Sequence, residues 1–494
     1  MTLLVLPLAI PFATAVAAYL LRADPARRRA VSVAGAAALF LATVVLFERV
    51  WLEGPVAAQM GGWAAPFGIT LVADLLAAAM TLVTGAAGLA LTIYGLGEVG
   101  EAEERAGHSA LAHALLGAVC GGFLTGDLFN LYVWFEVMLI CSFGLLALKG
   151  GRAQIDGAVK YAALNLLATI GFLAGVGLLY GATGALNMAD LRGAVAGRLE
   201  ETAILAPAAL LLFAFSAKAG LFPLFFWLPA SYHTPSVTVS ALFSALLTKV
   251  AVYALFRVFT LIFPIDQTPL LQSLLLWVAL LTMVVGVLGA AAQNQVRRIL
   301  SFHIVSQIGY MILALALYTP LAAAGGLFYM VHNIVAKTNL FLTGGVAQRL
   351  TGSEDLAEMG GIWAARPFAG MLFLLSALAM AGMPPLSGFW AKFFLVRESI
   401  ALGYHLEAGV ALAVGLLTLY SMTKIWTEAF WKPRPAGAVS ARAPWSMLAP
   451  AAALTGLIVA MGVWIAPFYA VAERAAQGLF DPAPYLAAVL GAGA

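Results

Sequence analysis

Long apolar runs alternate with short polar connections along the whole chain. A helix needs about 20 apolar residues to cross a bilayer, and the 494 residues contain fourteen runs that approach or exceed this length. We predict spans near residues 2–21, 30–51, 69–96, 109–126, 128–148, 157–180, 203–229, 235–263, 269–292, 299–318, 321–347, 367–402, 406–430 and 446–468. The pattern predicts an all-α polytopic membrane protein with about 14 transmembrane helices.

Composition excludes the other broad classes of protein. The chain is 63% hydrophobic and only 10% charged, whereas a soluble domain is about 25% charged. A soluble fold could not bury so much apolar surface, and a disordered chain would need low hydrophobicity and high charge. The net charge of +3 gives no basic surface for nucleic acid. Cys120 and Cys141 lie in apolar runs, so we expect neither a disulfide nor a metal cluster there.

The basic residues predict the orientation in the membrane. The loop after the first span contains Arg22, Arg27, Arg28 and Arg29, and the loops on the same side contain most of the other loop lysines and arginines. Because basic loops stay in the cytoplasm, we expect both termini outside a bacterial plasma membrane. The first span has no basic residue ahead of it, so we interpret it as an uncleaved helix.

Lysines inside the spans are the main candidates for chemistry. Arg257 and Arg397 lie near the outer ends of their spans, and the basic residues that remain within spans are all lysines: Lys160, Lys218, Lys249, Lys337, Lys392 and Lys424. A charge within the membrane is costly and is rarely kept without a use. Lysine loses its proton when desolvated, whereas arginine keeps it. Lys160 and Lys424 lie near span ends and could reach the interface; the other four are deeper and suit proton transfer.

Three further ionisable residues join the deep lysines. Glu136 lies in an apolar stretch of the fifth span, and His332 shares the eleventh span with Lys337. A lone histidine can also be a hydrogen-bonded core residue. Asp74 in the third span is a speculative cation ligand, or a residue that caps or pairs locally.

The seventh and twelfth spans are predicted to be broken. Each contains proline near its middle, at Pro223 in one and at Pro384 and Pro385 in the other. Proline removes a backbone donor, and such breaks occur in membranes where they line a cavity or pack against protein. A kink that only shapes helix packing is the alternative interpretation.

Matching segments suggest an internal repeat. Ala219-Gly220 aligns with Ala381-Gly382, and residues 157–165 align with 325–333, so spans 6 and 7 resemble spans 11 and 12. A repeat unit of five spans is odd, which makes successive copies inverted, as in many transporters. We therefore divide the chain into an N-terminal segment (1–108), a first repeat (109–263), a second repeat (264–430) and a C-terminal segment (431–494).

The motifs around these residues resemble a known family. They are Gly126–Ile140 with Glu136, Gly184–Leu191, Ser231–Ser236 and the segment Gly382–Gly388 before Lys392. Together with Lys218 and Lys249 they look like the antiporter-like subunits shared by respiratory complex I, membrane-bound hydrogenases and Mrp-type antiporters. Within that family the whole chain is most similar to the D subunits of multisubunit sodium/proton antiporters.

The resemblance implies a function and a set of roles. Glu136 and Lys218 would form a switching pair, Lys249 a central relay, His332 and Lys337 its continuation, and Lys392 the terminal lysine. Proton influx would drive export of Na⁺ or K⁺ by a complex with the other Mrp subunits (A, B, C, E, F and G). The chain would be a transporter subunit and not an enzyme, with no cofactor.

Three alternatives remain open from the residues. A proton-pumping subunit of complex I or of a hydrogenase would keep the same lysines. A scaffold with a vestigial channel would not need four deep lysines and a buried glutamate. An organic-solute transporter would need a roomy polar cavity, whereas a file of lysines predicts a thin hydrated path.

Overall fold

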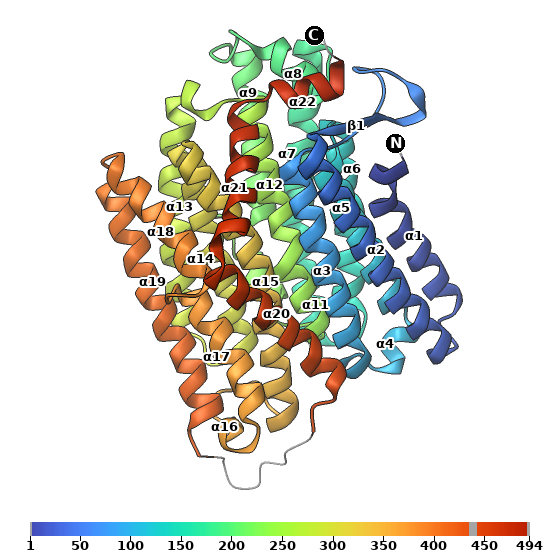
Figure 1. Cartoon of the computed structure of the whole chain (residues 1–494), viewed down its shortest axis with the longest axis vertical. Coiled ribbons are helices and arrows are strands. Elements are labelled where there is room, and N and C mark those ends of the chain that lie inside the picture. The colour runs from blue at the N-terminus through green and yellow to red at the C-terminus, as the bar shows by residue number, and fades with distance from the viewer. Residues whose placement is uncertain (1, 434–441, 492–494) are drawn as a thin grey trace.

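The computed structural model describes residues 2–433 and 442–491 as a bundle of long helices with short segments at both ends (Figure 1). The described chain begins and finishes at the same end of the bundle, which also carries strands β1 (Val56–Gln59) and β2 (Thr70–Ala73). We call this the termini end. The opposite end carries the short helices α4 (Glu101–Arg105) and α16 (Ile362–Ala365).

Helices account for nearly all of the remaining regular structure. The first half contains α1 (Thr2–Leu20), α2 (Pro25–Glu53), α3 (Leu75–Glu98), α5 (His108–Leu124), α6 (Leu128–Ala147), α7 (Arg152–Thr183), α8 (Met188–Val195), α9 (Thr202–Ala219), α10 (Trp227–Ser231), α11 (Val237–Leu242), the π-helical segment η2 (Phe243–Leu247) and α12 (Thr248–Leu261). The second half contains α13 (Pro269–Ala291), α14 (Val296–Leu317), α15 (Pro320–Thr351), α17 (Pro367–Ala381), α18 (Ser387–Ala401), α19 (His405–Ile425), the π-helical segment η4 (Trp426–Trp431), α20 (Trp445–Val463), α21 (Ile465–Phe480) and α22 (Ala483–Leu490). Two short 3₁₀ turns, Met60–Gly62 and Ile265–Gln267, complete the elements.

The helices follow the predicted spans closely. Among the described residues, eleven helices are long and apolar enough to cross a membrane, and α5 and α17 are shorter apolar helices. The predicted last span, 446–468, extends past the end of α20 at Val463, because the chain bends at Trp464 and continues as the separate helix α21. The division into segments stays a prediction, as does the inverted repeat, and residues 434–441 and 492–494 of the C-terminal segment lie outside the described residues.

Aspartates fix the starts of three helices. The side chains of Asp24, Asp74 and Asp127 accept backbone hydrogen bonds from the third residue of α2, α3 and α6, at 3.1, 2.9 and 2.7 Å. A side-chain oxygen at this position satisfies one of the free N–H groups of the first turn. Asp74 is therefore not inside a membrane span, as the sequence suggested, but immediately before it.

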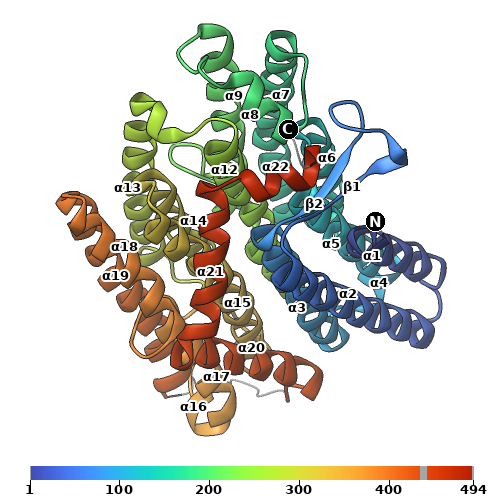
Figure 2. The ribbon, with the colours of Figure 1, turned by 45° about the horizontal axis from the view of Figure 1, so that its top comes forward.

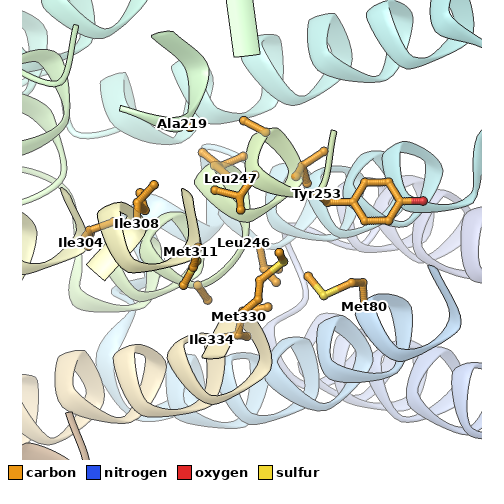
Figure 3. Close-up of a cluster of buried hydrophobic side chains, with 14 of the residues drawn as sticks. Met80, Ala219, Leu246, Leu247, Tyr253, Ile304, Ile308, Met311, Met330 and Ile334 are labelled. Atoms are coloured by element: carbon orange, nitrogen blue, oxygen red, sulfur yellow. The ribbon is translucent and has the colours of Figure 1, made fainter. Parts of the chain in front are cut away.

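The centre of the bundle is a helix buried on every side. Every residue from Val237 to Leu261, spanning α11, η2 and α12, is buried. Figure 2 shows α12, α14 and α15 between the N-terminal helices on one side and α18 and α19 on the other. In Figure 3, Leu246, Met311 and Met330 from these three parts of the fold meet in the apolar core. Lys249 on α12 and Lys337 on α15 are consequently enclosed by protein, each with 0% of its surface exposed.

Both expected helix breaks are present. Gly220 and Gly382 end α9 and α17 in the left-handed conformation, with φ of 78° and 92°. The Trp227 indole then donates to the Ala217 carbonyl at 3.1 Å, so a side chain from beyond the first break satisfies the backbone before it. Non-helical backbone at membrane depth requires such internal partners.

Close packing of α13 on α14 predicts a strong effect of one methyl group. A Cβ at Gly286 would lie 2.3 Å from the Ser306 backbone nitrogen. Gly286→Ala should therefore destabilise the protein by about 1–3 kcal/mol, measured by unfolding in mixed micelles. Gly409→Ala on α19 is the matched control, because its Cβ meets nothing within 4 Å. Equal stability of the two variants would contradict the close approach of Gly286 to the Ser306 backbone.

Candidate functional site

Ionisable side chains from five helices form a series through the bundle. Glu136 lies on α6, Lys218 on α9, Lys249 on α12, His332 and Lys337 on α15, and Lys392 on α18. The four lysines are 0 to 9% exposed. α9, which carries Lys218, packs against α12, and α15, which carries Lys337, packs against both α18 and the segment η2 that leads into α12. The structure thus brings the predicted site residues into one sequence of neighbours.

A threonine links the first two members of the series. Thr169 on α7 donates its hydroxyl hydrogen to Glu136 Oε1 at 2.6 Å and accepts a hydrogen bond from Lys218 Nζ at 3.0 Å. Lys218 Nζ also lies 5.1 Å from the centre of the Phe135 ring. Glu136 and Lys218 are therefore connected through one hydroxyl group and do not form a direct ion pair.

The central lysine has only a backbone partner. Lys249 Nζ donates to the Ser244 carbonyl, which belongs to η2, at 2.7 Å. On the same helical stretch, the hydroxyl groups of Ser240, Ser244 and Thr248, at four-residue spacing, are buried without a protein partner. Buried polar groups of this kind are usually satisfied by internal water. The surroundings of Lys249 thus have the polar groups that a hydrated path needs.

Polar groups around α15 continue the series. Lys337 Nζ donates to the Leu300 carbonyl at 3.3 Å. His332 Nδ1 lies 2.8 Å from Ser387 Oγ, while its Nε2 is buried without a partner. The His332 ring stacks on Tyr329, whose hydroxyl hydrogen-bonds to Gln307. The Nδ1 atom of His332 is therefore held by Ser387 at the start of α18, whereas its Nε2 atom has no protein partner.

The last lysine of the series binds backbone carbonyls at the second helix break. Lys392 Nζ donates to the carbonyls of Met380 and Ala381 at 3.0 Å each, at the end of α17. It also lies 5.0 Å from the centre of the Tyr310 ring. A cavity of about 460 Å³ reaches Lys392 and Gly382 from the side of α19. This end of the series thus borders an open space.

Asp74 does not lie in this series. Both of its carboxylate oxygens bind Arg257, at 2.7 Å to Nη2 and 2.7 Å to Nη1. Asp74 is thus bound by a guanidinium and by a helix N-terminus, an arrangement that favours local capping and pairing over the alternative of a cation ligand. Among the described residues no group of three or more His, Cys, Asp or Glu side chains could hold a metal ion.

The two lysines assigned to span ends have ordinary surroundings. Lys160 forms an exposed ion pair with Asp156 at 2.6 Å. Lys424 donates to the carbonyls of Ala291 and Gln293, at 3.2 and 2.8 Å, where α13 ends. The partners of Lys160 and Lys424 are not members of the series, and neither lysine side chain is buried.

Comparison with known proteins identifies the family. A family model described as NADH:quinone oxidoreductase/Mrp antiporter, TM, matches residues 125–426. The chain belongs to this family. Its match covers every residue of the series from Glu136 to Lys392, and the resemblance inferred from the motifs is confirmed.

Relatives in the NADH:quinone oxidoreductase/Mrp antiporter family match along the full length. A protein of Alkalihalophilus pseudofirmus, named as the D subunit of a Na(+)/H(+) antiporter, is 41% identical over 490 residues, covering 99% of each chain. One of Bacillus subtilis with the same name is 38% identical over 494 residues, covering 98% of this chain and 99% of the relative. These relatives are antiporter subunits and not enzymes.

Solved structures of the family share the fold. A chain in the Mrp complex of a Dietzia species superposes with a TM-score of 0.92 at 33% identity, with 99% of each chain covered. A chain of an archaeal sulfane sulfur reductase gives 0.92 at 26%, and one of Thermus thermophilus respiratory complex I gives 0.82 at 25%; each covers 99% of this chain and 100% of the other. The protein is thus an all-α, multi-pass membrane protein of the antiporter-like type.

The buried pair of Asp74 and Arg257 predicts a large loss of stability when one partner is removed. Arg257→Met should cost about 3 kcal/mol or more, because it leaves a buried carboxylate unpaired. The exposed pair offers the control: Lys160→Met should cost less than about 1 kcal/mol. Denaturant unfolding in mixed micelles measures both. A double variant with Asp74→Asn should recover part of the loss, and no recovery would contradict a direct pairing.

Proposed function

We propose that this chain is the proton-translocating D-type subunit of a multisubunit Na⁺ or K⁺/proton antiporter. The observation that carries the proposal is the series Glu136–Thr169–Lys218, Lys249, Lys337 and Lys392, in which each ionisable group has a hydrogen-bond partner that tolerates a change of protonation. His332 contributes an exchangeable ring nitrogen beside Lys337. Protons move along the series as the charge on one member alters the proton affinity of the next.

The energy source is the electrochemical gradient of protons. A membrane potential supplies about 2.3 kcal/mol per charge for each 100 mV, which is enough to drive export of a monovalent cation against a moderate gradient. The full-length relatives are named subunits, and the Dietzia structure is a complex. We infer that this chain works with the other Mrp subunits (A, B, C, E, F and G).

The same comparison supports a proposal for the location. Relatives are bacterial, and we place the chain in the bacterial plasma membrane. The basic loops favour the cytoplasm for the end that carries α4 and α16. The termini end then faces outward. Accessibility of a cysteine introduced at exposed His405 or Arg366, at opposite ends of the bundle, tests this orientation.

A redox-driven proton-pump subunit is the alternative function. The similarity to chains of the sulfur reductase and complex I favours it, because those assemblies are respiratory. Sequence identity favours the antiporter: the chain is 41% and 38% identical to antiporter subunits, but 26% and 25% identical to the respiratory chains. We therefore give the antiporter precedence.

Vesicles containing the complete gene cluster test the function. In wild type, adding Na⁺ or K⁺ should collapse a preformed proton gradient. Glu136→Gln, Lys218→Ala and Lys392→Ala should each lower the rate at least tenfold in assembled complexes, because each interrupts the series. Lys160→Ala, at an exposed pair, is the control and should retain the rate. A gradient that forms only with an electron donor and ignores cations would reject the antiporter in favour of the redox pump.

The bridging hydroxyl gives a sharper prediction for the same assay. Thr169→Val keeps the shape of the side chain and removes the hydrogen bonds to Glu136 and Lys218, so transport should fall about tenfold or more. Thr169→Ser keeps the hydroxyl and should stay within about twofold of wild type. Equal rates for the two variants would show that the hydroxyl plays no part in transfer.

A further inference from the structure

Two adjoining cavities form one amphipathic cleft along α2, α3 and α21. The first, about 480 Å³, is lined by apolar side chains such as Phe40, Phe47, Leu76, Phe328, Met461 and Phe468. The second, about 400 Å³, lies nearer the termini end, and its polar lining is Glu53, Asp74, Arg474, Gln477, Asp481 and Tyr485. Ala475 lines both cavities. The cleft is therefore apolar at depth and charged at its mouth.

The charges at the mouth have both signs. Arg474 donates to the Trp51 carbonyl at 2.8 Å and lies over the Trp51 ring at 4.9 Å. No carboxylate in the described chain forms an ion pair with it. Glu53 pairs with Arg49 on its own helix, and Asp481 accepts a hydrogen bond from the Ala483 backbone. The guanidinium thus retains donors for an anion, and two carboxylates beside it can receive a cation.

The cleft is as deep as one leaflet of a membrane. Glu53 at the mouth and Phe40 at the far end both lie on α2, and the helix between them is about 20 Å long. One leaflet has about 15 Å of hydrocarbon, with the headgroup region beyond it. Trp51 and Tyr485 at the mouth are the residue types that gather at the headgroup level.

We propose that a zwitterionic phospholipid of the leaflet at the termini end binds in this cleft. One acyl chain lies in the apolar part, the phosphate binds Arg474, and the headgroup ammonium faces Glu53 and Asp481. The charge pattern at the mouth argues for this occupant, because Arg474 offers donors to an anion while Glu53 and Asp481 face a cation, as a zwitterionic headgroup requires. Lipid tails are apolar everywhere in a membrane, so the charged mouth supplies the selectivity.

The bound acyl chain would pack against α15, the helix that carries His332 and Lys337. Leu327, Phe328, Val331 and Val335 of α15 line the apolar part, and His332 and Lys337 lie on the same helix. α15 also packs directly against α3 and α21, and an acyl chain in this position fills the space that remains beside these contacts. The proposal rests on the cleft alone and holds whichever cation is exchanged.

Lipid retention by the purified complete complex tests the proposal. After delipidation, synthetic phosphatidylethanolamine or phosphatidylglycerol with identical chains is added, and lipid bound to this subunit is measured by native mass spectrometry. Wild type should retain phosphatidylethanolamine at least fivefold more than phosphatidylglycerol. Ala79→Phe fills the apolar part and should lower retention at least tenfold, whereas Ala413→Phe on the exposed face of α19 should not. Equal retention by these two variants, or a preference for phosphatidylglycerol, overturns the proposal.

A second pair of variants separates a loss of lipid binding from misfolding of the Ala79→Phe protein. Arg474→Gln leaves the apolar part intact and should abolish the preference for phosphatidylethanolamine, whereas Arg366→Gln at the opposite end should keep it. A photoreactive probe, Val44→p-benzoylphenylalanine, identifies the occupant in membranes. An adduct with the mass of one phospholipid supports the proposal, and an adduct with another subunit shows that the cleft is a protein interface.

Discussion

The interaction on which the site depends is a hydrogen bond from a buried ammonium group to a neutral oxygen. Lys218 binds a hydroxyl, and Lys249, Lys337 and Lys392 bind backbone carbonyls. In the described residues, ion pairs of lysine occur only near the ends of the bundle, at Lys149, Lys160 and Lys432. A carboxylate in contact would hold a lysine in its charged form. A neutral partner can serve both the charged and the uncharged amine.

Irregular backbone provides the partners of Lys392 and Lys249. Met380 and Ala381 end α17 with carbonyls that no following helical turn satisfies, and Lys392 takes both. Ser244, which binds Lys249, belongs to a π-helical segment. In a bilayer, unsatisfied carbonyls and unpaired ammonium groups are each too costly to leave alone. At the second break, Lys392 and the freed carbonyls therefore stabilise one another. The guanidinium of Arg257 is instead paired with the carboxylate of Asp74.

Most of the fold could be predicted from the sequence because a membrane restricts the choice of structure so strongly. Hydrophobic length located the helices, and proline with glycine located both breaks at Gly220 and Gly382. The deep lysines were conspicuous because charge is rare in such segments. Thr169 was not predictable, since a threonine in an apolar helix normally bonds to its own backbone and carries no further signal. Asp74 was misplaced because its partner, Arg257, is 183 residues away and the pairing exists only after folding.

The π-helical segment Phe243–Leu247 has a consequence for how the length of the central helix can change. A π-turn holds one more residue than an α-helical turn, so a chain that lacks one residue here can close into regular helix and keep both flanks in register. The same deletion within α12 would turn everything beyond it by about 100° and shift it by about 1.5 Å. Because α12 is buried on every side, such a rotation would press its side chains into packed neighbours. The segment is thus the place where this helix can gain or lose a residue, although losing it would also remove the carbonyl geometry that Lys249 uses.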